Sequence, residues 1–135
     1  MVRLLSVQEA LSRWEEIVPR LERVLAKNHG EYALAHVQTN LTKGIMQLWV
    51  LEGVTGNLHS ICVTELVDYN QFRACNIMMA EGSLDSRWAP AIEYIGRLAK
   101  EQGCVRLEAL ARPGWLKKAK QFGFGLLYMK IYKAL

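Results

Sequence analysis

The stretch IMQLWVLEGVTGNLHSICVTELV, residues 45–67, decides the fold that the sequence predicts. It contains two apolar runs rich in β-branched residues, separated by a glycine-rich turn sequence at Gly53–Asn57. This pattern is typical of a β-hairpin. A second turn sequence at residues 68–71 and a third apolar run at residues 72–80 follow. Together they predict a three-stranded antiparallel meander.

Helix and strand patterns alternate after the meander. Residues 83–102 carry apolar side chains at helical spacing, and Gly103 is the expected C-terminal glycine of that helix. Residues 105–110 alternate as a strand. Residues 112–122 predict a short basic helix, and residues 124–132 predict a last strand.

The segment before the meander is predicted to be mainly helical. Residues 2–5 favour a short strand. Ser6 and Glu9 have the spacing of a capping box, and apolar residues follow at helical intervals. Because proline removes a backbone donor and clashes with the preceding turn, we expect two helices, with Pro19 near the start of the second. A third short helix is expected over residues 32–41.

The order of these elements predicts an α/β (α+β) fold with a mixed, mostly antiparallel central sheet and helices on both faces. The chain has 135 residues, of which 51% are hydrophobic and 22% charged. That size and balance are typical of one globular domain, so we expect a single domain over residues 1–135.

Several classes of protein are disfavoured by composition. No apolar run approaches the roughly 20 residues that cross a bilayer, and the N-terminal residues do not resemble a signal peptide. Cys62, Cys75 and Cys104 are odd in number and far apart, which argues against a disulfide framework and a zinc site. We therefore expect reduced core cysteines, a cytoplasmic location, and neither a metal nor a membrane partner.

The order of elements resembles the GNAT family of N-acetyltransferases over nearly the whole chain. The best local match is Ala99–Gly103, followed by a strand and a short helix that ends in Phe122-Gly-Phe124. A narrower resemblance is to small acetyltransferase-like proteins of tailed bacteriophages, which tend to be encoded among virion assembly genes. The residues that carry it are Gln47–Val50, Gly103-Cys104, Arg112–Trp115 and Gly123-Phe124.

The GNAT resemblance implies an acetyl-CoA site that this sequence lacks in part. The family's diphosphate motif, Q/R-x-x-G-x-G/A, brings bare backbone close to phosphate at a helix N-terminus. Here the motif falls on residues 83–88, with Ser83, Ser86 and Trp88 at its three defining positions. The family's tyrosine acid, four residues before the closing Gly-Phe, corresponds to Ala119.

Some residues remain candidates for the chemistry that the resemblance implies. A general base is expected near the strand ends, where the alternative interpretation is a set of solvent-facing carboxylates. Candidates for the base are Glu65, Asp68 and Glu81; for cofactor binding, Ser86, Arg87, Trp88 and Arg112; and for binding a protein partner, Trp88, Trp115, Lys117, Lys118 and Lys120.

Three functions follow from these observations. The leading prediction is a non-catalytic binding or assembly component of a tailed-phage virion, without cofactor, found in the infected cell or the virion. Its partners would be phage structural proteins or further copies of the chain. The alternative is a divergent acetyl-CoA-dependent N-acetyltransferase. The third is a nucleic-acid-binding module that uses the C-terminal basic face of a chain with net charge +4.

Overall fold

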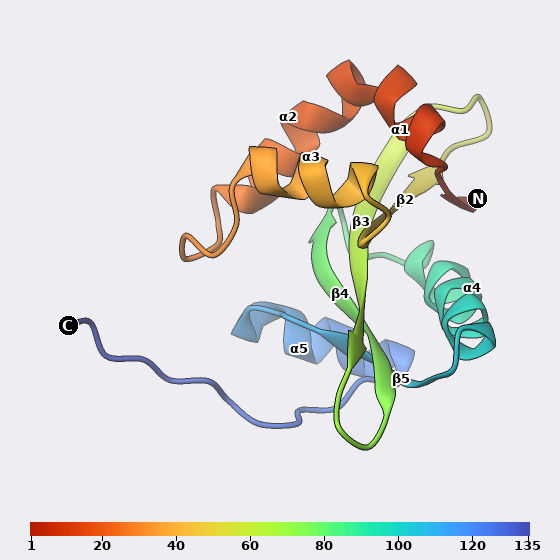
Figure 1. The fold of residues 1–135 in the computed structure, drawn as a ribbon. Helices are drawn as coiled ribbons and strands as arrows, with labels where there is room; N and C mark the ends of the chain where they lie inside the picture. Colours follow the sequence, from red (N-terminus) through yellow and green to blue (C-terminus); the bar gives the residue numbers. More distant parts are fainter.

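The computed structural model describes residues 1–135 and contains five strands in one sheet, together with five α-helices and a short 3₁₀ helix (Figure 1). The strands are β1 (Val2–Leu4), β2 (Met46–Glu52), β3 (Leu58–Asp68), β4 (Arg73–Glu81) and β5 (Cys104–Ala109). The helices are α1 (Val7–Ser12), α2 (Trp14–Leu25), α3 (Leu34–Thr42), α4 (Trp88–Glu101), α5 (Pro113–Ala119) and the 3₁₀ turn η1 (Lys120–Phe122).

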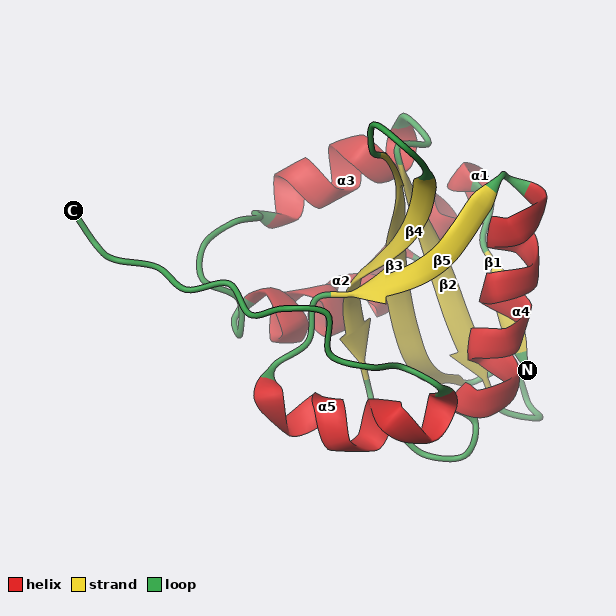
Figure 2. Ribbon diagram, turned by 90° about the horizontal axis from the view of Figure 1, so that it is seen from below, coloured by secondary structure: helices red, strands yellow, loops and turns green.

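The sheet has the order β1-β2-β3-β4-β5. Neighbouring strands are antiparallel from β1 to β4, and β4 pairs with β5 in parallel. The parallel pair requires a crossover, and α4 supplies it (Figure 2). The predicted α/β class and mixed, mostly antiparallel sheet are therefore confirmed.

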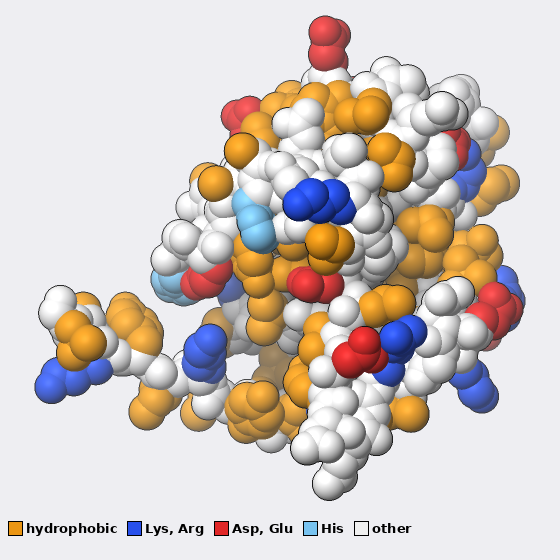
Figure 3. Space-filling view, viewed as in Figure 1, with side chains coloured by type: hydrophobic (Ala, Val, Ile, Leu, Met, Phe, Trp, Pro, Cys, Tyr) orange, Lys and Arg blue, Asp and Glu red, His pale blue; other side chains and the backbone are white.

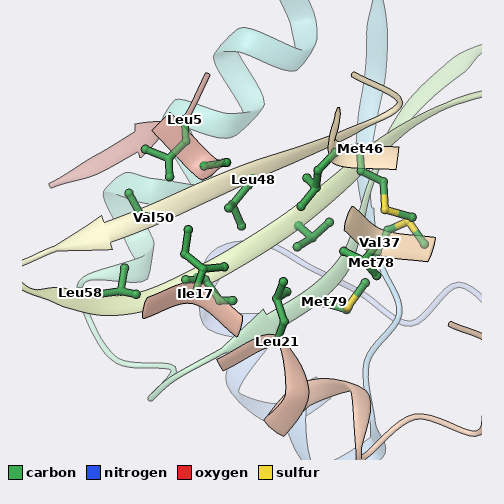
Figure 4. Close-up of a cluster of buried hydrophobic side chains, with 14 residues drawn as sticks. Leu5, Ile17, Leu21, Val37, Met46, Leu48, Val50, Leu58, Met78 and Met79 are labelled. Carbon is green, nitrogen blue, oxygen red and sulfur yellow. The ribbon is translucent and has the colours of Figure 1, made fainter. Parts of the chain in front are cut away.

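The sheet is buried on both faces by two separate clusters. Figure 4 shows the cluster on the α1–α3 face, where Ile17 and Leu21 of α2 lie against the side chains of the strands. The cluster on the α4 face contains Trp49, Trp88 and Ile95. From Leu48 to Leu51 of β2, successive side chains belong to the two clusters in turn. This explains why nearly every residue of the strand is apolar.

The helices before the sheet begin and end differently from the prediction. The capping box of Ser6 and Glu9 is confirmed at the start of α1. The break, however, falls at Arg13 and not near Pro19, which lies inside α2. Burying Ile17 and Leu21, both 0% exposed, outweighs the hydrogen bond that proline removes from this helix.

The C-terminal segment does not form the strand predicted over residues 124–132. After Gly123, whose φ of 88° ends η1, the last backbone hydrogen bond joins Phe124 N–H to the Ala119 carbonyl. Residues 125–135 then run away from the sheet as extended chain (Figure 1). The prediction was wrong because a strand needs a pairing partner, and this segment makes no backbone hydrogen bond with any strand of the chain.

None of the helices has both the length and the hydropathy needed to span a bilayer.

Candidate functional site

The strands β4 and β5 separate halfway along β4. Their pairing runs from Arg73 opposite Cys104 to Ile77 opposite Ala109, and the Leu110 N–H then donates to the Ile77 carbonyl at 3.2 Å. Residues 78–81 continue β4 with no strand on that side. An unpaired strand edge of this kind can hold an extended ligand through backbone hydrogen bonds.

An extra residue in β4 marks the point of separation. Val63 of β3 pairs with Met79, whereas the next residue, Thr64, pairs with Ile77, so Met78 is unmatched. This is a β-bulge, which bends a strand and re-aims the residues around it. The bulge therefore turns the second half of β4 away from β5 and leaves its edge open.

A row of polar side chains crosses the sheet beside this bulge. Glu65 on β3 lies opposite Asn76 on β4, and Asn76 lies opposite Glu108 on β5. Paired residues project from one face of a sheet, so these three, which we call the acidic row, are neighbours. Met46, the partner of Glu65 on β2, belongs to the cluster under α1–α3. The acidic row therefore projects from the α1–α3 face of the sheet.

The members of the acidic row differ in their partners. Glu108 accepts hydrogen bonds from Tyr69 Oη at 2.6 Å and from Arg106 Nη2 at 2.6 Å. The bond to Glu108 raises the pKa of Tyr69. Glu65 is half-buried and has no ion pair. Burial of Tyr32, together with the nearby charge of Glu65, raises the pKa of Tyr32. Glu65 is thus a carboxylate with no cation of its own.

The two other candidate bases are held by arginines. Asp68 pairs with Arg73 at 2.6 Å, in the hairpin at the far end of β4 from the bulge. Glu81 pairs with Arg20 at 3.0 Å and with Arg23 at 3.7 Å. Both carboxylates therefore have structural partners, and Glu65 is the one of the three that the structure leaves available.

The segment between β4 and α4 closes on itself. Asp85 Oδ1 accepts the Arg87 backbone N–H at 3.0 Å, and its carboxylate also pairs with the Arg87 guanidinium at 3.0 Å. The hydrogen bond from the Arg87 backbone N–H lowers the pKa of Asp85, and the Arg87 guanidinium lowers it further. The N–H groups of Trp88 and Ala89 donate to the carbonyls of Asp85 and Ser86, and the next residue is a proline without an N–H.

Trp88 is part of the core and not of the surface. Its side chain is 1% exposed, and its Nε1 donates to the Ser83 carbonyl at 2.9 Å. This bond explains why α4 begins at Trp88, five residues later than predicted. A buried side chain offers nothing to a protein partner, and Ser83 and Ser86 at its flank present no bare glycine backbone.

The remaining candidates lie on α5. Arg112 is its N-cap residue and is exposed, and Trp115 is half-buried. Lys117, Lys118 and Lys120 are exposed and make no ion pair with any carboxylate. The end of α5 is fixed to the body because Phe122 and Phe124 pack against the cluster that contains Trp88. The structure thus fixes the end of this basic helix to the core on the α4 face of the sheet.

Sequence reasoning missed Asn76, Glu108 and Tyr69. A one-residue bulge decides which β4 side chains lie opposite Glu65, and no signal in the sequence marks it. A cluster of His59, Ser60 and Asp85 was also missed: His59 Nδ1 lies 2.7 Å from Ser60 Oγ, and its Nε2 lies 3.4 Å from Asp85. Ser60 is 0% exposed, so this cluster ties the loop to β3 and has no accessible nucleophile.

Solved structures share the fold of this chain over almost their full length. An aminoglycoside acetyltransferase from an uncultured soil metagenomic sample, in complex with sisomicin, has a TM-score of 0.72 and 14% identity, covering 100% of this chain and 95% of its own. Aminoglycoside N-acetyltransferase AAC(6')-Iy in complex with CoA has a TM-score of 0.73 and 14% identity, covering 100% and 93%. This chain has the fold of the GNAT acetyltransferases.

A plant enzyme of the GNAT fold gives the same result. Glucosamine-6-phosphate N-acetyltransferase from Arabidopsis thaliana has a TM-score of 0.67 and 12% identity, covering 99% of this chain and 97% of its own. No family model and no curated protein matches the sequence itself. These three solved structures are acetyltransferases, and they overturn the leading prediction of a non-catalytic virion component, which was wrong.

The two ends of the site fit acetyl-CoA to different degrees. The unpaired edge of residues 78–81 suits the amide-bearing arm of CoA, which can add to it as a strand would. The start of α4 cannot bind the diphosphate of CoA through backbone N–H groups, as the GNAT motif does. Asp85 and Ser86 already accept hydrogen bonds from those N–H groups. Arg87, 60% exposed, is the cation nearest to that end in sequence, and α5 carries the others.

Proposed function

We propose that the protein is an acetyl-CoA-dependent N-acetyltransferase that acts on an amine. The observation that carries the proposal is the bulge at Met78, which opens the β4 edge two residues from Asn76 and beside the unpaired Glu65. The GNAT fold of the solved acetyltransferases supports it. It replaces the virion role and keeps the alternative that the sequence had offered.

Glu65 would bind the acceptor and remove its proton. An amine is protonated at neutral pH, and its ammonium form cannot attack a carbonyl. A half-buried carboxylate without a cationic partner attracts that ammonium group and accepts the proton that frees its lone pair for attack. The second proton, lost as the amide forms, passes to solvent. The Asn76 amide, opposite Glu65, can orient the amine, and Glu108 on the same face is balanced by its ion pair with Arg106.

Each end of the bound donor would meet a different part of the chain. Residues 78–81 would hold its amide arm, and Arg87 with the lysines of α5 would meet its phosphates. When bound, acetyl-CoA supplies a thioester whose C–S bond breaks as the C–N bond to the acceptor forms, with CoA leaving as a thiolate. Ala119 carries no proton for that thiolate, so solvent protonates it.

The test is amine-dependent release of the CoA thiol by the purified full chain. We expect release with a panel of primary amines, and a loss of about 10²–10⁴-fold in kcat/KM in Glu65→Gln. Asp68→Asn is the matched control, because its carboxylate belongs to the hairpin ion pair with Arg73. Equal activity of Glu65→Gln and wild type would remove Glu65 from the mechanism. No thiol release with any amine would refute the proposed function.

A further inference from the structure

The carboxylate of Asp85 binds the groups at the start of α4 that an anion would use. Its Oδ1 accepts hydrogen bonds from the Arg87 backbone N–H at 3.0 Å and from Arg87 Nε at 3.2 Å, and its Oδ2 accepts from Arg87 Nη2 at 3.0 Å. A backbone N–H beside a guanidinium is a donor set that suits phosphate oxygens. A carboxylate of the chain itself therefore fills donors that a diphosphate needs.

The donors of Arg87 are the ones at this end of α4 that a side-chain movement can release. The N–H groups of Trp88 and Ala89 donate to the backbone carbonyls of Asp85 and Ser86, and the next residue is a proline. Those backbone bonds form the first turn of the helix and break only if the turn itself opens. The bonds to the Asp85 side chain, in contrast, end when a single carboxylate moves away.

The loop that carries Asp85 is fixed at both ends. Gly82 has a φ of 115° and lies so close to β3 that an added Cβ would collide with Ser60 Oγ. At the other end of the loop, the buried Trp88 donates its Nε1–H to the Ser83 carbonyl. A loop fixed in this way holds its carboxylate in place without a further ordering cost.

His59 lies on the other side of the same carboxylate. Its Nε2 is 3.4 Å from Asp85 Oδ2, and its Nδ1 is 2.7 Å from the buried Ser60 Oγ. When the Ser60 hydroxyl donates to Nδ1, the ring proton is on Nε2 and faces Asp85. Asp85 is thus held between β3 and the start of α4.

The other cations of the chain do not reach Asp85. Arg87 and His59 are the two basic residues that pair with it. Arg20 of α2 pairs with Glu81 instead. Figure 3 shows the lysines of the last segment on a part of the chain that projects from the body, and α4 lies on the opposite side of the molecule in the same view (Figure 1). A diphosphate at this end therefore needs the cation that Asp85 already holds.

We propose that Asp85 is an intramolecular competitor of the donor's diphosphate, and that the chain therefore distinguishes only weakly between acetyl-CoA and a donor with the same thioester arm but no nucleotide. The inference rests on the proposed function, because it takes acetyl-CoA as the donor. Arg87 must leave Asp85 before it meets a phosphate, and the displaced carboxylate then repels the diphosphate. The amide-bearing arm, at the unpaired edge of residues 78–81, needs neither residue.

The first test is titration calorimetry of the purified full chain with acetyl-CoA. We expect Asp85→Asn to bind about fivefold to tenfold more tightly than wild type, the gain of about one charged contact. The asparagine Oδ1 still accepts the Arg87 N–H, so the turn is kept while the charge is lost. Asp68→Asn is the matched control, because it removes the same charge from a carboxylate that holds an arginine at the opposite end of β4. An equal gain in the control, no gain in Asp85→Asn, or no binding by any variant would overturn the proposal.

The second test repeats the titration with acetyl-pantetheine, which has the thioester and the amide arm but no diphosphate. We expect wild type and Asp85→Asn to bind it equally. A purely structural role of Asp85 predicts a change with both donors, because a loosened loop disturbs the whole site. A change of the same size with both donors would therefore refute competition for the diphosphate.

Amine-dependent thiol release, measured on the same samples, separates this inference from the proposed function. Tighter binding of acetyl-CoA by Asp85→Asn without thiol release from any amine would support the competitor and refute acetyl transfer. Thiol release by a chain whose affinity for acetyl-CoA is the same with Asp or Asn at position 85 would support acetyl transfer and refute the competitor.

Discussion

The N-terminal and C-terminal regions of this molecule differ in how their charged and apolar groups are satisfied. In the N-terminal region Arg3, Arg13 and Arg20 all pair with glutamates at 2.7–3.0 Å. In the C-terminal region the cations of α5 and the last segment pair with no carboxylate, and seven large apolar side chains are exposed. The first region is stabilised by ion pairs within the chain, whereas the second presents unpaired cations and exposed apolar side chains.

The largest effect is expected from a core leucine of the first region. Leu21 of α2 is 0% exposed, so Leu21→Ala should lower the free energy of unfolding by about 2–5 kcal/mol. Leu110→Ala, at a leucine that is 65% exposed, should change it by no more than about 0.5 kcal/mol. Urea denaturation of both variants measures the contrast. Similar losses would mean that the regions do not differ.

A smaller effect is expected from the ion pairs of the first region. Glu52, whose side chain is 12% exposed, accepts hydrogen bonds from Arg3 at 2.7 Å and Arg13 at 2.8 Å. Glu52→Gln should cost about 1–2 kcal/mol at pH 7, toward the low end because Arg3 is partly exposed. The bond to Arg3 is the main reason that the pKa of Glu52 is lowered.

The direction of that pKa change sets the pH dependence. A carboxyl whose pKa is lower in the folded state contributes its full stabilisation above its ordinary pKa, and the contribution is lost as pH falls through the folded pKa. The difference between wild type and Glu52→Gln should therefore be constant near neutrality and shrink below about pH 4. A difference that persists unchanged at pH 2 would mean that the charge of Glu52 is not what stabilises the region.

The smallest effect is expected from a single cation of the second region. Titration calorimetry with acetyl-CoA should show affinity falling by roughly tenfold in Arg87→Ala, the loss of about one charged contact. Arg23→Ala, which removes an arginine of similar exposure (62% against 60%) from α2, should leave the affinity unchanged. Equal losses in both variants would indicate a general charge effect. Unchanged affinity in Arg87→Ala would remove this residue from the site.

The sequence predicted most of the fold because its strands and helices are locally periodic. The meander, the capping box and the long crossover helix all have signals that lie within a few residues of each other. Pro19 misled the prediction because its local cost is smaller than the gain from burying Ile17 and Leu21, which only the tertiary structure reveals. The last strand was predicted from a valid local pattern, yet a strand also needs a partner.

The candidate site was less predictable for a similar reason. Glu65, Asp68 and Glu81 look equivalent in sequence, and only the arginines that reach two of them distinguish the third. Trp88 was expected to bind a cofactor or a protein partner, but it is 1% exposed and its Nε1 donates to the Ser83 carbonyl. The bulge at Met78 depends on register between two strands, and a single sequence carries no record of register.

The unpaired C-terminal segment also bears on how the protein behaves at high concentration. Leu126–Tyr132 combines strong strand preference with one charge and no proline, a composition that stacks into fibrils when it is left unpaired. Lys130 and Lys133 repel their equivalents in such a stack, so their charges oppose that aggregation.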